Sequence, residues 1–227
     1  MYVREIEGKE TTFGVSGALW RDALIFFDRD TESYWSQIDG RSLTGDHKGK
    51  RLVKYPSVQT SWGEWKKMHP DTLVLKPDTR SRTGSPYAHY FEDPDKMGVL
   101  GTKNPDKRLP GKTLVLGIEA GSSYAAVPLR RLEKKGVLEL DADGPVVAIR
   151  SPGGDGFAYR PVADGMRLHF TLEDGQLIDR ETGSRWDPAA GKAVAGLMEG
   201  ETLPRLDARK IFWFVWAGFH PETVVVK

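Results

Sequence analysis

The chain has 227 residues, enough to bury one large core or two small ones. Its 33 Lys and Arg residues nearly cancel its 32 Asp and Glu residues, and the net charge of +1 gives no electrostatic case for a nucleic acid or an anionic membrane as partner. Cysteine is absent, which excludes disulfides, a thiol nucleophile and cysteine-type zinc sites.

No apolar run approaches the roughly 20 residues that a transmembrane helix needs. The longest run, 211–219, is about half that length, and residues 1–5 lack the apolar core of a signal peptide. We therefore expect a soluble body without a transmembrane segment, or one from which an export segment has been removed. The 25 Gly and 14 Pro residues predict many turns and few long helices.

The first third of the chain has β-type patterning. Residues 11–15 and 19–27 are predicted strands, separated by a turn at Ser16–Gly17. Residues 26–35 indicate a hairpin, at whose tip Asp and Thr side chains bond to the backbone. A further strand is expected at 52–55.

A short helix is expected next. Ser61 and Glu64 have the spacing of a capping box, and Pro70 ends the helix directly after His69. A strand at 73–75 should follow. Beyond it, a stretch rich in Pro, Gly, Asp and Lys predicts a long irregular connection, which we place at residues 77–112.

The rest of the chain continues the β pattern. Strands are expected at 114–119, 124–129, 146–150, 157–160 and 166–172. A second hairpin over 177–186 then repeats the first, and a second Trp-rich helix ends in His220-Pro221.

A constant offset of 151 residues relates the two parts of the chain. It pairs Asp28 with Asp179, together with Arg29/Arg180, Thr31/Thr182, Ser33/Ser184, Trp35/Trp186, Gly40/Gly191, Gly45/Gly196, Gly49/Gly200, Leu52/Leu203, Trp62/Trp213, Trp65/Trp216 and His69/His220. This register indicates an internal duplication. We predict that residues 28–75 superpose on 179–226, with Trp35, Trp62 and Trp65 buried as in the second copy.

The predicted fold is mainly β (α+β), built from two pseudo-repeats of hairpins and strands, each with one short Trp-rich helix that ends in His-Pro. The first repeat spans 1–76, the connection 77–112 and the second repeat 113–227, unless all three fuse into one globular domain.

The duplication is lopsided, because residues 114–150 map to positions ahead of Met1. Either the first half lacks this β-rich segment or upstream sequence has been cut away. A long strand edge is seldom left bare. We expect residues 1–12 and the central strands to form one sheet shared by both halves, or a second copy to add a strand, giving a homo-oligomer or filament.

Two sets of polar side chains are candidate binding residues. Asp28 and Arg29, with Asp179 and Arg180 in the second copy, could clamp a carboxylate or phosphate, with Ser33 beside them. The alternative is a turn in which Asp and Thr satisfy backbone amides while Trp fills the core.

The paired histidines His69 and His220 could bind a metal or act as general bases. A cap at the end of a helix is the alternative, and no histidine or carboxylate spacing typical of a metal site accompanies them, so we expect no metal and no cofactor. Tyr87 and Tyr90, in a loop near prolines, are candidates for an exposed contact surface or a lid over the core.

Several motifs, in this order and spacing, are similar to those of the domain-of-unknown-function 3179 family. They are 13–17 (FGVSG), 27–29 (FDR), 31–33 (TES), 35–37 (WSQ), 56–57 (PS), 60–62 (TSW), 69–75 (HPDTLVL), 86–87 (PY) and 213–216 (WFVW). The resemblance covers nearly the whole chain. It implies a bacterial or archaeal protein, often exported and so extracytoplasmic or secreted, with no settled activity.

This chain departs from that family in one respect. Typical members begin with a further segment, resembling residues 115–149 here, that carries a Cys-Pro-x-Cys motif and a His. Here that leading segment and all cysteines are missing, so chemistry that depends on those thiols is excluded.

Two hypotheses for function follow. The first is a non-catalytic binding or structural module that works outside the cytoplasm, with an unknown ligand. The alternative is a hydrolase or transferase whose site lies between the repeats and uses Asp28, Arg29, Ser33 or His69. An enzyme would need these groups to converge in one pocket, and the sequence assigns no residue a catalytic role.

Overall fold

A computed structural model describes residues 1–55, 57, 59–74, 88–98, 101–151 and 155–226. The predicted mainly-β class is confirmed: the described part of the chain consists of small sheets with four short helices. The predicted helices are α1 (Trp62–Met68) and α4 (Trp213–Phe219). Two further helices, α2 (Ala88–Glu92) and α3 (Leu129–Lys135), were not predicted.

The first half, residues 1–76, forms a three-stranded antiparallel sheet of β3 (Phe13–Trp20), β4 (Ala23–Asp28) and β5 (Tyr34–Ser36), beside the short pair β1 (Glu5–Ile6) and β2 (Lys9–Glu10). The expected turn at Ser16–Gly17 is wrong. β3 runs through these residues with a register shift, and the chain turns at Arg21–Asp22. Both turn residues have positive φ, 52° and 61°, as two-residue hairpin turns require.

The prediction of a strand at 52–55 is also wrong, because these residues form only an isolated β-bridge, between Lys54 and Tyr2. Leu73 and Val74 are described but belong to no strand, and Leu75 lies outside the described residues.

The second half, residues 113–227, contains most of the sheets. A four-stranded sheet has the order β17 (Asp207–Phe212), β6 (Leu114–Ala120), β7 (Ser123–Pro128), β18 (Val224–Val225). A three-stranded sheet has the order β10 (Gly156–Tyr159), β9 (Pro145–Arg150), β8 (Val137–Asp141). The remaining strands are the pair β11 (Val162–Ala163) and β12 (Met166–Arg167), and the sheet of β13 (Phe170–Glu173), β14 (Gln176–Asp179), β15 (Arg185–Asp187) and β16 (Lys192–Ala195).

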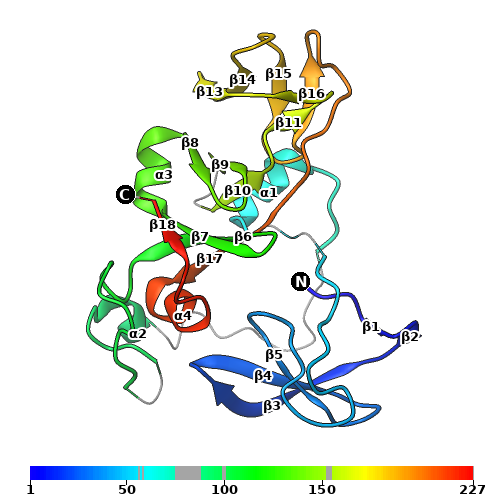
Figure 1. The fold of residues 1–227 in the computed structure, drawn as a ribbon, viewed down its shortest axis with the longest axis vertical. Helices are drawn as coiled ribbons and strands as arrows, with labels where there is room; N and C mark the ends of the chain where they lie inside the picture. The colour runs from blue at the N-terminus through cyan, green and yellow to red at the C-terminus, as the bar shows by residue number, and fades with distance from the viewer. Residues whose placement is uncertain (56, 58, 75–87, 99–100, 152–154, 227) are drawn as a thin grey trace.

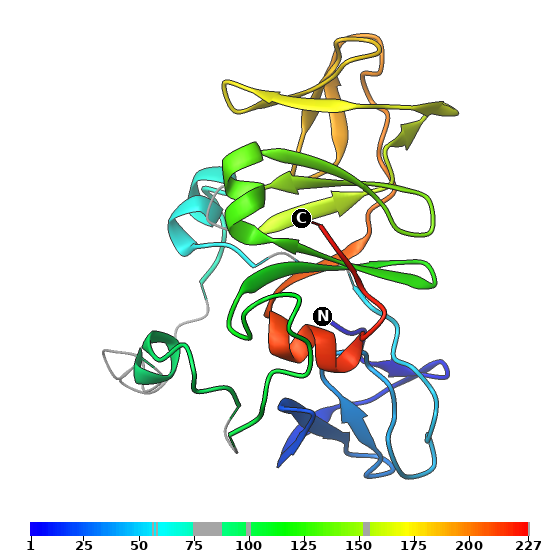
Figure 2. The ribbon, with the colours of Figure 1, turned by 60° about the vertical axis from the view of Figure 1, so that its left-hand side comes forward.

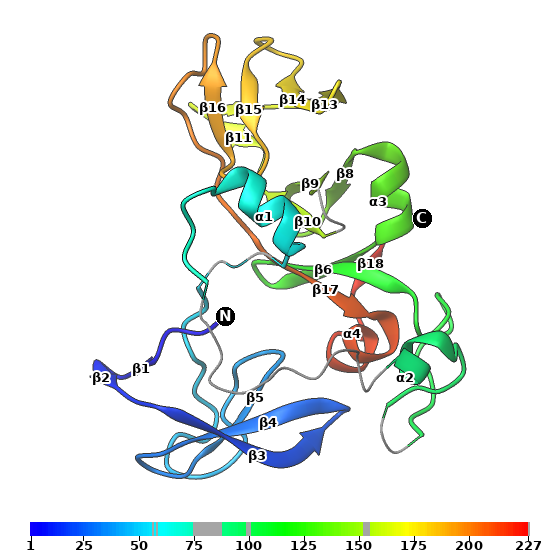
Figure 3. The same ribbon diagram turned by 180° about the vertical axis from the view of Figure 1, so that it is seen from behind.

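The two hairpin sheets lie at opposite ends of the long axis of the molecule, with β6 to β10, β17 and α3 between them (Figure 1). α4 and α2 lie on the side of this middle region that faces the β3–β4–β5 sheet (Figure 1). α1 lies on the outside of the middle region (Figure 2), on the face that Figure 3 turns to the viewer. Among the described strands no sheet combines the two halves, so the expectation of one shared sheet is wrong.

Matched hydrogen bonds recur in the two halves. Trp35 Nε1 donates to Asp28 Oδ2 at 2.9 Å, and Trp186 Nε1 donates to Asp179 Oδ2 at the same distance. The helix ends match as well: Trp65 Nε1 donates to Thr72 Oγ1 at 3.0 Å, and Trp216 Nε1 to Thr223 Oγ1 at 2.9 Å. These contacts support the predicted duplication.

Upstream of the β3–β4 hairpin the offset becomes 157 residues, because this hairpin has six more residues than the β13–β14 hairpin. Tyr2 therefore corresponds to Tyr159. Tyr2 bridges to Lys54 and Tyr159 bridges to Arg205, and each ring lies where a side chain at the matching glycine, Gly40 or Gly191, would collide with it. The strands β1 to β5 thus correspond to β11 to β15 and α1 corresponds to α4, whereas no described strand corresponds to β16, β17 or β18. At this offset Met1 corresponds to Ala158.

The two helices differ in burial. Trp35, Trp213 and Trp216 are 0% exposed, but Trp62 is 52% and Trp65 36% exposed, so the prediction that both are buried is wrong. The physical reason lies in what packs against each helix. In the second half β6 and β7 cover α4 and form a core cluster with it, whereas no core cluster of the described residues includes a residue of α1.

Candidate functional site

The two halves meet through an ionic cluster, Lys54, Glu119, Asp207 and Arg209. Lys54 forms ion pairs with Glu119 and, at 3.0 Å, with Asp207 of the other half. Arg209 also pairs with both carboxylates and donates to the carbonyl of Ile38 at 2.6 Å. Burial raises the pKa of Asp207, but the charges of Arg209 and Lys54 outweigh it, so the net pKa is lowered. Two cations and two anions thus hold the halves together.

His220, at the end of α4, lies in the same region. It is 6% exposed and stacks on the Tyr124 ring at a centroid distance of 3.8 Å. Its Nε2 atom has no hydrogen-bond partner among the described residues. Burial, with a further contribution from the Lys54 charge, lowers the pKa of His220 to about 4. This histidine is therefore a neutral packing residue at neutral pH.

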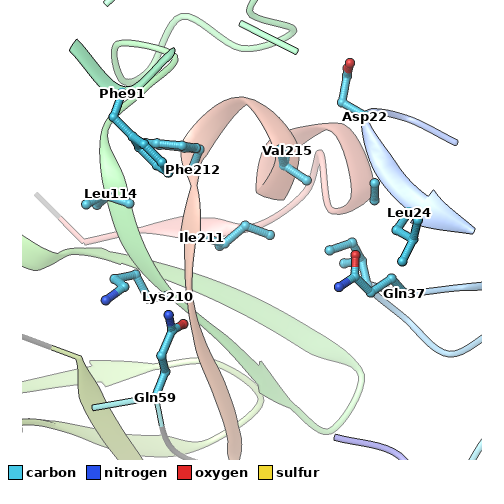
Figure 4. Close-up of a pocket in the computed structure, with 12 residues that line it drawn as sticks. Asp22, Leu24, Gln37, Gln59, Phe91, Leu114, Lys210, Ile211, Phe212 and Val215 are labelled. Carbon is cyan, nitrogen blue, oxygen red and sulfur yellow. The ribbon is translucent and has the colours of Figure 1, made fainter. Parts of the chain in front are cut away.

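A cavity of about 310 Å³, which we call the interhalf cavity, lies beside this contact. It is lined by Asp22, Ala23, Leu24, Gln37, Ile38, Gln59, Phe91, Leu114, Lys210, Ile211, Phe212 and Val215. Figure 4 shows Leu24 and Gln37 on one side, Leu114 and Phe212 on the other, and Ile211 between them. Its wall is therefore built from both halves and from α2.

The polar groups of the interhalf cavity are few, and two of the four are already paired. Asp22 accepts a hydrogen bond from Thr102 Oγ1 at 2.5 Å, and Lys210 pairs with Asp155 at 2.5 Å. The other two are the carboxamides of Gln37 and Gln59. None of the described lining residues is a Ser, Thr, Tyr or His, so the lining offers no hydroxyl nucleophile with an imidazole base. It suits binding of an apolar group that carries a hydrogen-bonding end.

The predicted binding residues Asp28 and Asp179 lie inside their turns, 0% exposed. Asp28 Oδ1 accepts from the Thr31 amide at 2.7 Å, and both oxygens accept from Thr31 Oγ1. Burial raises the pKa of Asp28, but the bonds from Trp35 and Thr31 lower it below its usual value. Thr182 and Trp186 bond to Asp179 in the same way. These carboxylates organise the turn.

The remaining candidates do not converge on one site. Ser33 is buried and shares a 2.7 Å hydrogen bond with Thr31 Oγ1. Arg29 and Arg180 are exposed, and Arg29 lies over the Phe27 ring at 5.6 Å. A second cavity, of about 260 Å³, touches Asp28, but it contains neither Arg29 nor Ser33 in its lining.

The histidine and tyrosine candidates are also apart from one another. His69 is exposed on α1, against Trp65 at 4.2 Å, while His220 is buried in the other half. Tyr90 lies on α2 under the Lys112 ammonium, 4.0 Å from its ring centroid, and Tyr87 lies outside the described residues.

Two absences apply only to the described ranges. No group of three or more His, Asp or Glu side chains there is placed to hold a metal ion. None of the helices in the same ranges is long and apolar enough to cross a lipid bilayer.

Sequence reasoning missed the interhalf cavity and the ionic cluster. Ile38, Phe91 and Val215 come from three separate stretches of the chain, and no sequence pattern links them. The one signal was the apolar run 211–219, which contributes three lining residues.

Comparison with known proteins gives one match. A family model described as "Protein of unknown function (DUF3179)" matches residues 1–223. Neither curated proteins nor solved structures gave a match.

Proposed function

The chain belongs to the DUF3179 family of proteins of unknown function, and we propose that it is a non-catalytic binding module whose ligand occupies the interhalf cavity. The lining of the cavity carries this proposal. It combines apolar side chains from both halves with the carboxamides of Gln37 and Gln59, and it contains no hydroxyl nucleophile with an imidazole base. The ligand class is a small apolar molecule with an amide, hydroxyl or carbonyl end.

The size of the cavity supports a small ligand. At about 310 Å³ it lies at the lower limit of the roughly 300–1,000 Å³ typical of small-molecule sites, which is room for one aromatic ring or a short acyl chain. Lys210 is already paired with Asp155, and Asp22 already accepts a hydrogen bond from Thr102. The carboxamides of Gln37 and Gln59 therefore supply the hydrogen bonds to the polar end of the ligand. The extracytoplasmic location and the homo-oligomer both stay predictions from the sequence.

NMR titration of the full chain tests this proposal, with benzyl alcohol and hexanamide as probes. We expect saturable shifts of the Ile38, Ile211 and Val215 methyl groups. Val215→Phe places a ring in the cavity and should weaken probe binding by at least about tenfold, a loss typical of a blocked apolar subsite. The matched control is Val194→Phe, because Val194 is 55% exposed on β16, away from the cavity.

Two results would contradict the proposal. One is titration without saturable shifts at any of the three methyl groups. The other is equal probe affinity in the Val215→Phe and Val194→Phe variants, which would place the bound probe elsewhere.

A further inference from the structure

We propose that the outer surface of α1, together with Leu73 and Val74, is a docking surface for a β-hairpin from outside residues 1–226. This surface, the α1 face, consists of Trp62, Trp65, Leu73 and Val74. All four are exposed, Leu73 at 96% and Val74 at 65%. Large apolar side chains gathered in this way mark interaction sites in soluble proteins.

The pattern of α1 shows that one side of the helix is built for a partner. Trp62 and Trp65 are three residues apart and therefore share a face. The intervening and following positions carry Glu64, Lys66 and Lys67, which suit solvent. In α4 the corresponding positions are Val215, Ala217 and Gly218, and the helix is covered. These three positions are therefore charged in α1 and uncharged in α4.

The second half shows what covers such a face. There the hairpin β6–β7 lies against α4, and a side chain at Gly117 would collide with the Trp216 ring. Tyr124 of the same hairpin stacks on His220. The strand after the helix, β18, pairs in parallel with β7, Val224 opposite Ala125. The positions equivalent to Val224 and Val225 are Leu73 and Val74, which belong to no strand.

The α1 face already has the geometry of the covered copy. Trp65 donates to Thr72 as Trp216 does to Thr223. The ring centroids of Trp65 and His69 are 4.2 Å apart, against 4.3 Å for Trp216 and His220. The backbone at the helix end also agrees, with φ of −133° at His69 and −131° at His220. A partner would therefore meet a preformed surface, which lowers the entropic cost of binding.

These contacts define the partner by its chemistry. It is a two-stranded antiparallel hairpin with a glycine opposite Trp65, an aromatic ring opposite His69, and a strand whose edge pairs in parallel with Leu73–Val74 by β-augmentation. The β6–β7 hairpin of a second copy is not this partner, because β6 and β7 lie inside their own sheet between β17 and β18.

A fusion protein tests the proposal with the β6–β7 hairpin, which already packs on α4. A copy of residues 113–157 is joined directly ahead of Met1, the position that the 157-residue offset assigns to it. A tether replaces bimolecular binding by a high effective concentration, which compensates for the marginal stability of an isolated hairpin. The matched control is the same fusion with Gly117→Val in the added copy only, where the valine side chain would strike Trp65 as it would strike Trp216 in the second half.

Hydrogen exchange measured by mass spectrometry supplies the readout. We expect amides of residues 62–74 to exchange at least about tenfold more slowly in the fusion than in the unfused chain, and the Gly117→Val fusion to lose that protection. Equal exchange of 62–74 in the fusion and the unfused chain overturns the proposal, as does protection that the Gly117→Val fusion retains.

Two alternative occupants are tested on the unfused chain. Protection of residues 62–74 that rises with protein concentration would assign the face to a second copy. Protection on addition of phosphatidylglycerol vesicles would assign it to a membrane. Either result overturns the hairpin proposal.

Discussion

Trp216→Ala should lower the free energy of unfolding by about 4 kcal/mol, whereas Trp65→Ala should lower it by only about 1 kcal/mol. The two residues occupy matching places in matching helices and make the same hydrogen bond to a threonine. They differ in cover, since Trp216 is 0% and Trp65 36% exposed. Truncation of Trp216 leaves a cavity against β6 and Tyr124, while truncation of Trp65 changes a surface that solvent can fill.

Urea unfolding of the two variants and of the parent chain measures this difference. The pair is its own control, because the change in side chain is identical and the two helix ends have the same backbone geometry. Equal losses of stability in both variants would mean that α1 is covered as α4 is, and would contradict the difference in burial between Trp65 and Trp216.

The second large effect concerns pH. The pKa of His220 is lowered to about 4 in the folded chain from about 6.5 in the unfolded one. In the interval between these values the unfolded state binds more protons. The stability that the neutral His220 contributes is therefore fully present above pH 6.5 and is lost as the pH falls toward 4. Between about pH 7 and pH 4.5 this loss amounts to about 2 kcal/mol.

His220→Phe removes the effect and keeps a ring against Tyr124. We expect the variant to be at least as stable as the parent chain at pH 7, because Nε2 of His220 lacks a hydrogen-bond partner among the described residues. Over the same interval its stability should fall by about 2 kcal/mol less than that of the parent. His69→Phe, on the exposed histidine of α1, serves as the control. A parent and a His220→Phe variant with parallel pH profiles would contradict a buried neutral histidine.

Side-chain patterns in the sequence predicted the start of α1 and the two Asp-based turns. Ser61 caps the start of α1 as the sequence predicts, with the Glu64 amide donating to Ser61 Oγ at 3.3 Å. The turns at Asp28 and Asp179 have the predicted structural role, and their bonds to Trp explain why both residue types recur in both copies. Each of these features depends on residues within eight positions of each other.

Two helices escaped prediction for a local reason. α3 has only Leu129 and Leu132 on its buried side, too few for a visible helical period. The sequence did carry a signal for the end of this helix, because Gly136 follows Lys134 and Lys135. Gly136 has a φ of 75°, as a glycine that ends a helix often has. α2 is five residues long and lies in a stretch whose prolines and glycines indicate an irregular connection.

The burial of the tryptophans could not follow from the repeat alone. An offset in sequence predicts equal local conformation, and the helix ends are equal. Burial depends on what packs from elsewhere, and no core cluster of the described residues includes Trp65. The interhalf cavity and the ionic cluster are likewise tertiary features, because Lys54 meets Glu119 and Asp207 from distant parts of the chain.

Among the described residues the β6–β7 hairpin covers α4, whereas the tryptophans of α1 are exposed. Hydroxyl-radical footprinting of the native chain, read by mass spectrometry at each tryptophan, tests this difference most directly. The structure predicts fast oxidation of Trp62 and Trp65 and strong protection of Trp213 and Trp216. Similar oxidation rates at all four tryptophans would contradict this difference.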